Sequence, residues 1–372
     1  MSTIDGTPRS RRRLLAGVLA LSVVLVAACS DDSSSGVTAT SPAGTKGGTG
    51  AGATSLSGTV KLGFFPNVTH APALVGVAEG TFTAALGDGV DFQTFTFDSG
   101  TTAAEALLAG SLDLTFIGPN PAINAYAQSG GKAVRIVAGS TSGGAYLVVK
   151  PGLTSAAQLK GKTIATPSLG NTQDVALRSW LKDNGIATTA DGGGDVTILP
   201  QKNATTLESF VNGSIAGAWV PEPWATRLIA EGGGKVLVDE RDLWKQTGGQ
   251  FVTTHLIVRT EFLGAHPDLV KAVIEGLSRA IDLIDKDPAK AQSDVVAQIK
   301  EITGSAPKAD TIGKSFANLT FTLDPIAASL QKSAADAVSV GLLKQVDLHG
   351  IYDLTLLNEV LKAIGKPEVK GL

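Results

Sequence analysis

Short β-type runs alternate with runs of helical periodicity between residues 59 and 260. Residues 90–97 alternate with a period of two, which is typical of a half-buried strand. This alternation predicts an α/β fold with largely parallel sheets. The predicted strands are 59–65, 90–97, 112–117, 134–139, 145–149, 162–165, 196–199, 216–220, 236–238 and 253–259. The predicted helices are 71–79, 102–109, 121–129, 172–184, 205–212 and 223–231.

Helix starts in this half are marked by capping residues. Thr205 and Glu208 fit a capping box, Asn171 fits an N-cap, and Pro72 and Pro121 suit first-turn positions. Each of these residues therefore predicts where a helix begins.

The pattern changes after residue 267, where helical periodicity continues without a convincing strand. The predicted helices there are 267–284, 288–302, 308–318, 325–340 and 354–364. We expect two α/β lobes with a helical C-terminal section, joined near Gly143-Gly144 and Gly248-Gly249. The expected boundaries are 59–143 for the first part of lobe 1, 144–249 for lobe 2 and 250–372 for the return to lobe 1.

The N-terminus has the pattern of an export signal. Arginines at positions 9 and 11–13 precede the apolar run 14–28, which is too short for a comfortable membrane span. The run leads directly to Cys29, the only cysteine of the chain. Residues 26–29, Val-Ala-Ala-Cys, resemble the bacterial lipobox, which implies cleavage before Cys29 and lipidation of its thiol. The basic residues fit the general secretory route and the twin-arginine route, and both stay open.

Residues 30–58 are almost wholly Ser, Gly, Thr, Ala, Asp and Pro. Because this composition cannot bury apolar surface, it predicts a disordered tether, spanning about 30 Å root-mean-square. Removal of residues 1–28 takes away four arginines and Asp5, and leaves 27 basic and 33 acidic side chains, a net charge of −6. Such a chain offers no basic face for nucleic acid. Without further cysteines, and with only four histidines, neither disulfides nor a metal site is expected.

Strand-to-helix junctions rich in Gly, Pro, Asn, Ser and Thr carry the candidate chemistry. They occupy residues 64–70, 98–102, 118–121, 140–143, 167–173 and 219–224. In α/β sheets such loops gather at the carboxyl ends of strands, where ligands bind. Helix N-termini offer unpaired N–H groups and positive partial charge, so they can hold an anion without Lys or Arg. The same residues also serve as ordinary helix caps, and that interpretation stays open for each junction.

Aromatic residues in two of these junctions are candidates for the walls of a tail pocket. These are Phe64, Phe65, Trp219 and Trp224, for which core packing is the alternative. Glu222 between two prolines suits either a ligand amine or a structural role. The roles of His70, as a base or a ligand contact, and of Glu222 are left open.

Enzyme motifs fail on inspection. Gly161-Lys162-Thr163 ends like a phosphate-binding loop, but Ala156 stands where that motif requires Gly. Thr141 stands where a nucleophile elbow requires Ser. No nucleophile and base pair is recognisable, so we expect a protein that is not an enzyme and that needs no cofactor.

The body resembles the solute-binding proteins of ABC importers for nitrate, aliphatic sulfonates and taurine. The resemblance covers residues 59 to about 260 in order. It is carried by residues 61–67, 72–74, 106–113, 117–122, 159–165, 170–172 and 218–224. One departure is Pro221-Glu222-Pro223-Trp224, where sulfonate binders often read Trp-Asp-Pro-Tyr. This departure leaves the organic substituent of the ligand open.

The resemblance implies a two-lobed periplasmic-binding-protein fold of type II, whose lobes close around a ligand. The implied ligand contacts are Asn67, His70, Ser99, Gly100, Thr101, Gly118, Asn120, Ser142, Gly170, Asn171, Thr172, Trp219 and Glu222.

We therefore expect a monomeric, lipid-anchored binding protein on the outer face of the cell membrane. Its predicted partners are a small anionic organic solute of the aliphatic sulfonate type and an ABC permease with its ATPase. Taurine, nitrate or a thiamine-precursor pyrimidine are alternative ligands. A biosynthetic enzyme on the same fold is the alternative function.

Overall fold

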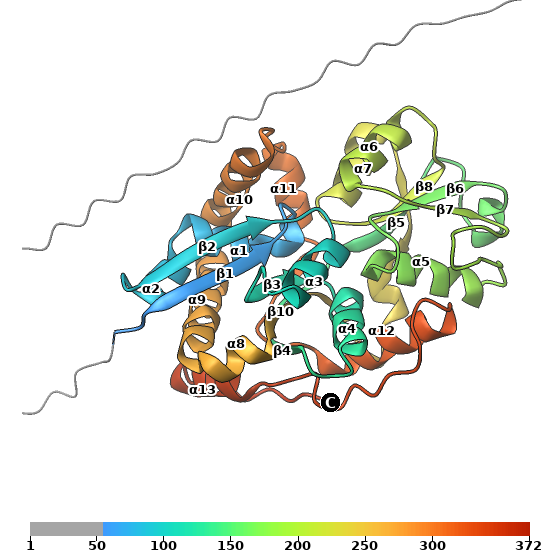
Figure 1. Cartoon of the computed structure of the whole chain (residues 1–372). Coiled ribbons are helices and arrows are strands. Elements are labelled where there is room, and N and C mark those ends of the chain that lie inside the picture. The colour runs from blue at the N-terminus through green and yellow to red at the C-terminus, as the bar shows by residue number, and fades with distance from the viewer. Residues whose placement is uncertain (1–54) are drawn as a thin grey trace, which may run out of the picture. The chain divides into compact units, whose positions relative to one another are not determined.

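The computed structural model describes residues 55–372, which form two lobes, each built on one β-sheet (Figure 1). The six strands of lobe 1 follow the order β11-β4-β10-β3-β1-β2, and the five strands of lobe 2 follow β7-β6-β8-β5-β9. The strands of lobe 1 are β1 (Gly58–Phe64), β2 (Val90–Thr96), β3 (Leu114–Ile117), β4 (Val134–Gly143), β10 (Val252–Arg259) and β11 (Leu319–Phe321). Those of lobe 2 are β5 (Ala145–Val149), β6 (Thr163–Thr166), β7 (Thr197–Pro200), β8 (Gly217–Pro221) and β9 (Lys235–Asp239).

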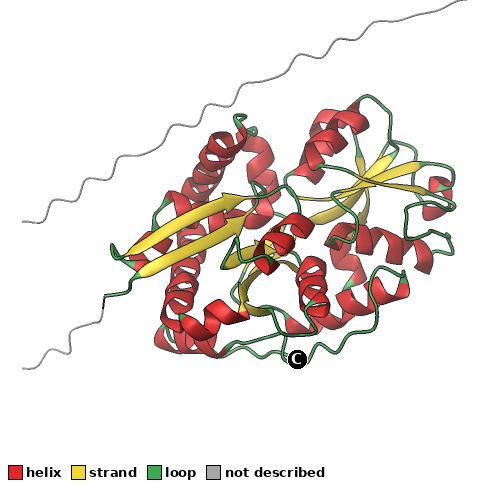
Figure 2. Cartoon of the chain, viewed as in Figure 1, coloured by secondary structure: helices red, strands yellow, loops and turns green. Residues whose placement is uncertain are grey.

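Helices surround both sheets (Figure 2). Three helices follow strands of lobe 2: α5 (Thr172–Asp183), α6 (Asn203–Val211) and α7 (Trp224–Gly232). The others are α1 (Ala71–Ala78), α2 (Thr81–Leu86), α3 (Gly100–Leu108), α4 (Pro119–Gln128), α8 (Thr260–Ala265), α9 (Pro267–Lys286), α10 (Pro288–Thr303), α11 (Ala309–Phe316), α12 (Ala327–Ser339) and α13 (Thr355–Ala363). Short 3₁₀ helices are η1 (Val68–His70), η2 (Ala156–Leu159), η3 (Glu240–Leu243) and η4 (Lys245–Thr247).

The predicted strands and helices are all present, with ends shifted by a few residues. The prediction of largely parallel sheets is wrong, because β10 and β11 in lobe 1 and β5 in lobe 2 pair antiparallel with their neighbours. The prediction of a C-terminal section without strands is also wrong. β11 has only three residues, too few to show a pattern.

Two smaller corrections concern segment ends. Helix α6 begins at Asn203, with Lys202 as its N-cap, so Thr205 lies inside the helix and forms no capping box. By contrast, the side chain of Asn171 caps α5 by accepting from the N–H of Asp174 (2.9 Å), as predicted. The tether was predicted to run to residue 58, but Gly58 starts β1 and Leu56 packs against the core. The predicted signal peptide, Cys29 and residues 30–54 lie outside the described residues.

The core of lobe 1 lies on both faces of its sheet. Along β10, Leu256 and Val258 belong to one buried cluster and Ile257 to another, as the two-residue period of a strand requires. Helix α9 covers the first cluster with an apolar stripe that includes Val273 and Leu277. These packed faces hold the carboxyl ends of β1, β2 and β3 in fixed positions.

The chain crosses between the sheets at two glycine pairs. β4 ends at Gly143 and β5 begins at Ala145, and φ is 82° at Gly143 and 71° at Gly144. The return from β9 to β10 passes through Gly248 and Gly249, at φ values of 64° and 82°. These left-handed conformations favour glycine, so both crossings depend on residues that lack a Cβ.

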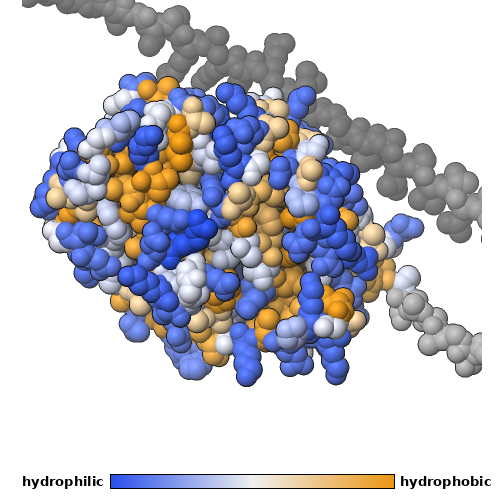
Figure 3. All heavy atoms as spheres, turned by 180° about the vertical axis from the view of Figure 1, so that it is seen from behind, coloured by the Kyte–Doolittle hydropathy of each residue, from blue (hydrophilic) through white to orange (hydrophobic). Residues whose placement is uncertain are grey.

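Hydrophobic residues (orange) and hydrophilic residues (blue) both occur across the face seen from behind (Figure 3). Large exposed apolar residues such as Leu169, Val211 and Ile229 come from different elements. Within residues 55–372, no helix combines the length and the hydropathy that a membrane span requires.

Candidate ligand-binding site

A small cavity of about 40 Å³ lies where the two lobes meet. It has room for a few water molecules, and so for a compact chemical group rather than a whole organic solute. Lobe 1 lines it with Phe65, Asn67, Thr69, His70, Asp98, Ser99, Gly100, Gly118, Pro121 and Thr253. Lobe 2 contributes Pro167, Asn171, Thr172, Gln173, Asn203 and Pro221.

Four helix N-termini reach this cavity. Ser99 is the N-cap of α3 and Gly118 is the N-cap of α4, both in lobe 1. In lobe 2, Thr172 begins α5 and Asn203 begins α6. The first N–H groups of a helix have no partner within it, and its macrodipole places positive partial charge at that end. The cavity is therefore surrounded by donors suited to an anion.

The start of α5 is held in place by a buried carboxylate. Asp174 accepts from the hydroxyl of Thr166 (2.9 Å), the N–H of Gly170 (2.9 Å) and Nε of Arg178 (3.0 Å). The side chains of Asp174 and Arg178 are both almost fully buried. Because all three bonds converge on one side chain, the first turn of α5 has little freedom to move.

Three polar atoms that line this cavity are buried and have no protein partner among the described residues. They are Nδ1 of His70, Oγ1 of Thr172 and Oδ1 of Asn203. Buried polar atoms are almost always hydrogen-bonded, so unpartnered ones require a water or a ligand. Their grouping in one cavity distinguishes it from a packing defect.

His70 contributes to the cavity as a neutral ring. It stacks on Phe65, with ring centroids 4.4 Å apart and an interplanar angle of 28°. Burial lowers the pKa of His70 to about 3, since the charged form loses its hydration. At neutral pH the ring therefore offers one N–H donor and one acceptor and carries no charge.

No cationic side chain lines the cavity, and Asp98 is the one acidic residue in its lining. Asp98 pairs with Lys202 across the cleft (2.5 Å), and both side chains are largely exposed. This ion pair lies at the rim, where solvent screens it. The positive partial charge that faces the cavity therefore comes from the helix N-termini.

The structure brings together seven of the thirteen residues predicted to contact ligand. Those that line the cavity are Asn67, His70, Ser99, Gly100, Gly118, Asn171 and Thr172. Those that do not line it are Thr101, Asn120, Ser142, Gly170, Trp219 and Glu222.

Trp219 packs in the core of lobe 2 and is fully buried. Its indole N–H donates to the buried carboxylate of Glu240 (2.8 Å) and its ring edge meets Trp180. Every second residue of β8 faces this core, and Trp219 falls on that side. The expectation that Trp219 walls a tail pocket is therefore replaced by core packing, and Phe64 likewise packs in the core of lobe 1.

Glu222 is buried in a polar network that joins the lobes. Its two carboxylate oxygens accept from the N–H and hydroxyl of Thr226, from Oγ of Ser315 (3.1 Å) and from Nδ2 of Asn318 (2.7 Å). Burial raises the pKa of Glu222, while these donors lower it. With four bonds made inside the protein, Glu222 has a structural role in this conformation.

The other four residues have structural partners or face elsewhere. Nδ2 of Asn120 donates to the carbonyl of Ser333 (3.0 Å), and Gly170 donates to Asp174. Thr101 is exposed on α3. Ser142 lines a separate groove beside the two crossings.

Cavity residues that the sequence did not single out are Thr69, Gln173, Asn203 and Thr253. Gln173 follows Thr172 in the same first turn of α5, so the reasoning from helix N-termini could have included it. Asn203 was hidden by the apparent capping box two residues later. Thr253 lies on β10 and has no local signal, because only the return of the chain to lobe 1 brings it to the cavity.

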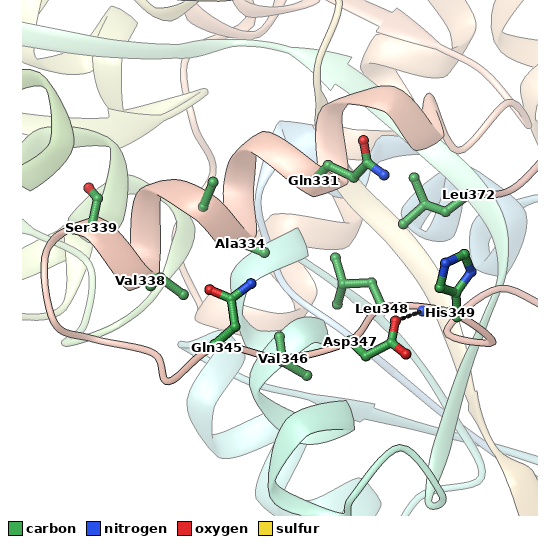
Figure 4. A pocket seen from close by; sticks show the side chains of 11 residues that line it. Gln331, Ala334, Val338, Ser339, Gln345, Val346, Asp347, Leu348, His349 and Leu372 are labelled. Carbon is green, nitrogen blue, oxygen red and sulfur yellow. Dashed lines mark hydrogen bonds between the residues drawn. The ribbon is translucent and has the colours of Figure 1, made fainter.

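The two largest grooves lie elsewhere. One, of about 650 Å³, lies between α12 and the segment that follows it, where Ala334, Val338 and Leu348 line the wall (Figure 4). The other, of about 860 Å³, lies beside the crossings and is lined by Arg241 and Lys245, among others. Neither groove gathers helix N-termini. Within residues 55–372, no three His, Cys, Asp or Glu side chains are grouped as metal ligands.

Comparison with known proteins bears on family and fold. Residues 54–300 match the NMT1-like family. The chain is 30% identical over 268 residues to the taurine-binding periplasmic protein of Escherichia coli (strain K12), covering 70% of this chain and 78% of that protein.

Two solved structures share the fold. The alkanesulfonate-binding protein SsuA from Xanthomonas axonopodis pv. citri, bound to MOPS, gives a TM-score of 0.66 at 20% identity and covers 81% of this chain and 99% of that one. The nitrate-binding protein NrtA from Synechocystis PCC 6803 gives 0.70 at 17% identity, covering 84% and 90%. The predicted two-lobed periplasmic-binding-protein fold is thereby confirmed, and so is the predicted resemblance. The chain belongs to the NMT1-like family of binding proteins.

Proposed function

We propose that this protein is the extracytoplasmic solute-binding component of an ABC importer, and that it holds the oxyanion head of a small solute in the cavity between its lobes. The observation that carries the proposal is the convergence of four helix N-termini on a cavity without a cationic side chain. Backbone donors and helix dipoles stabilise negative charge and need no counterion.

The size of the cavity favours a compact head group. About 40 Å³ accommodates a sulfonate, nitrate or carbonate-sized group. An outer groove of about 540 Å³ shares Asp98, Ser99 and Pro167 with the cavity and is also lined by Phe97 and Leu169. This arrangement supports an aliphatic sulfonate, whose head lies inside and whose short substituent extends outward. Taurine and nitrate fit the same head site.

The same family argues for delivery to a permease and its ATPase and for a location outside the cytoplasm. The taurine-binding relative is a periplasmic protein by name. Lipidation of Cys29, followed by the Ser-, Gly- and Thr-rich segment as a tether, and a monomeric state complete the proposal. No nucleophile with an adjacent base lies among the cavity residues, which supports binding over a biosynthetic reaction on the same fold.

Calorimetric titration tests the proposal. Methanesulfonate, taurine, nitrate, bicarbonate and hydroxymethylpyrimidine are titrated into the protein, with ethanolamine as a cationic control. We expect at least one oxyanion to bind, and at one hundred times its Kd to stabilise the fold by about 2.7 kcal/mol. Binding of the pyrimidine alone, or of ethanolamine with equal affinity, contradicts an anion site.

A further inference from the structure

Trp224 and Asn67 meet across the cleft. Trp224 is the first residue of α7 in lobe 2, and Asn67 precedes η1 in lobe 1. The indole N–H of Trp224 donates to Oδ1 of Asn67 (2.8 Å). Trp224 itself does not line the cavity, whereas Asn67 does. A residue outside the site thus contacts one inside it, and the contact joins the two lobes.

The chemistry of the indole decides which way the amide of Asn67 faces. An indole N–H only donates, so it requires the carbonyl arm of the amide and excludes the amino arm. Among residues 55–372, no acceptor is bonded to Nδ2 of Asn67. The amino group is therefore left free on the other arm of the same planar group, at the lining of the cavity.

We propose that Trp224 is a positioning residue: by holding Oδ1 of Asn67, it turns the amide N–H₂ of Asn67 toward the bound oxyanion. The bond spans the lobes, so the site gains this oriented donor only when the lobes close. The inference rests on the proposed function. It adds that closure of the two lobes orients one of the hydrogen-bond donors that contact the anion.

Both partners are held firmly enough for this role. The backbone N–H of Asn67 donates to the carbonyl of Phe65 (2.8 Å), and its carbonyl accepts from His70 (2.9 Å), so mainly the side chain is free to turn. The guanidinium of Arg227 lies 4.9 Å from the centroid of the Trp224 ring and pairs with Glu231 (2.7 Å). The indole is thus stacked in one orientation.

The test is a double-mutant cycle read as the Kd for methanesulfonate, taurine and nitrate. Trp224→Phe retains a ring and removes the donor, and we expect Kd to rise about 3- to 10-fold. Asn67→Ala removes the amide and raises Kd about 10- to 100-fold, since a bond to a charged ligand is lost. The double variant should match Asn67→Ala within about 2-fold. Trp180→Phe, a change of the same kind elsewhere in lobe 2, should leave Kd unchanged.

Asn67→Asp tests whether position 67 faces the anion. The carboxylate still accepts from Trp224, but it presents a negative oxygen where the amino group stood. We therefore expect Asn67→Asp to bind the anion more weakly than Asn67→Ala does, while the double-mutant cycle separates positioning by Trp224 from simple bridging of the lobes. Thermal unfolding without ligand shows that each variant is folded.

The outcomes are distinct. Additive effects of Trp224→Phe and Asn67→Ala, or retained binding by Asn67→Asp, overturn the inference and leave the proposed function standing. If none of the three anions binds the unmodified protein, the proposed function fails and the inference fails with it.

Discussion

Two polar clusters at the boundary between the lobes differ in one respect, although each includes a residue that was predicted to contact ligand. Around Glu222, the carboxylate finds four donors within the protein. Around His70, Thr172 and Asn203, three buried polar atoms find none among the described residues. Other buried polar atoms among the described residues also lack a partner, so what marks the candidate ligand site is the gathering of three such atoms in one cavity, rather than polarity or burial alone.

The largest effect is expected from a side-chain atom that fills the space between the lobes at the cavity. A Cβ at Gly118 would lie 2.5 Å from Oγ1 of Thr172 in the other lobe. We expect Gly118→Ala to hold the lobes apart and to weaken anion binding by more than about 100-fold, equivalent to about 2.7 kcal/mol. Calorimetric titration measures this loss. Gly264→Ala is the matched control, because a Cβ at Gly264 meets no atom within 4 Å.

Glu222→Gln tests the structural role of the hydrogen-bond network around Glu222. The replacement turns one acceptor oxygen into a donor that faces existing donors, so at least one bond to Thr226, Ser315 or Asn318 is lost. We expect the free energy of unfolding to fall by about 1–3 kcal/mol, as measured by urea denaturation. A variant of unchanged stability that fails to bind anions would instead place Glu222 among the ligand contacts.

The pH dependence of stability tests the neutral state of His70. The pKa of His70 is lowered to about 3 in the folded protein, whereas the unfolded chain protonates near the ordinary value of 6.5. Between these values the unfolded state binds one more proton, so stability is lost as pH falls from 6.5 toward 3.

His70→Gln should make the free energy of unfolding less dependent on pH. Between pH 4 and 6 its slope against pH should decrease by about 1.4 kcal/mol per pH unit. Buried His255, whose pKa is lowered to about 4, should maintain the rest of the slope. Denaturation at several pH values measures both proteins, and an unaltered slope in the variant would show that His70 is already charged in the fold.

The smallest effect is expected at the rim. Lys202 and Asp98 are exposed to 72% and 62%, and such pairs contribute little. Lys202→Gln should therefore leave the midpoint of urea denaturation unchanged within experimental error. A measurable drop in the midpoint, above all one that disappears at high salt, would show that the pair holds the lobes together.

The sequence predicted most of the fold because strand and helix periods are local properties. Val90 to Thr96 and the stripe of α9 are examples. It also predicted the start of α5, since Asn171 caps that helix through its own side chain, but it placed the start of α6 at Thr205 rather than at Asn203. What it could not decide depends on non-local partners. The indole N–H of Trp219 is already hydrogen-bonded to Glu240, a residue 21 positions further along the chain. Thr253 reaches the cavity only because the chain returns to lobe 1.

Whether the cavity binds an oxyanion is tested most directly by a crystal structure of the protein with bound methanesulfonate, whose sulfur gives an anomalous signal. We expect a single strong sulfur peak in the cavity between the lobes, within hydrogen-bonding reach of the first turns of α3 and α5 through the sulfonate oxygens. A peak in the groove beside the crossings, near Arg241 and Lys245, would contradict it and would assign anion binding to ordinary cationic side chains.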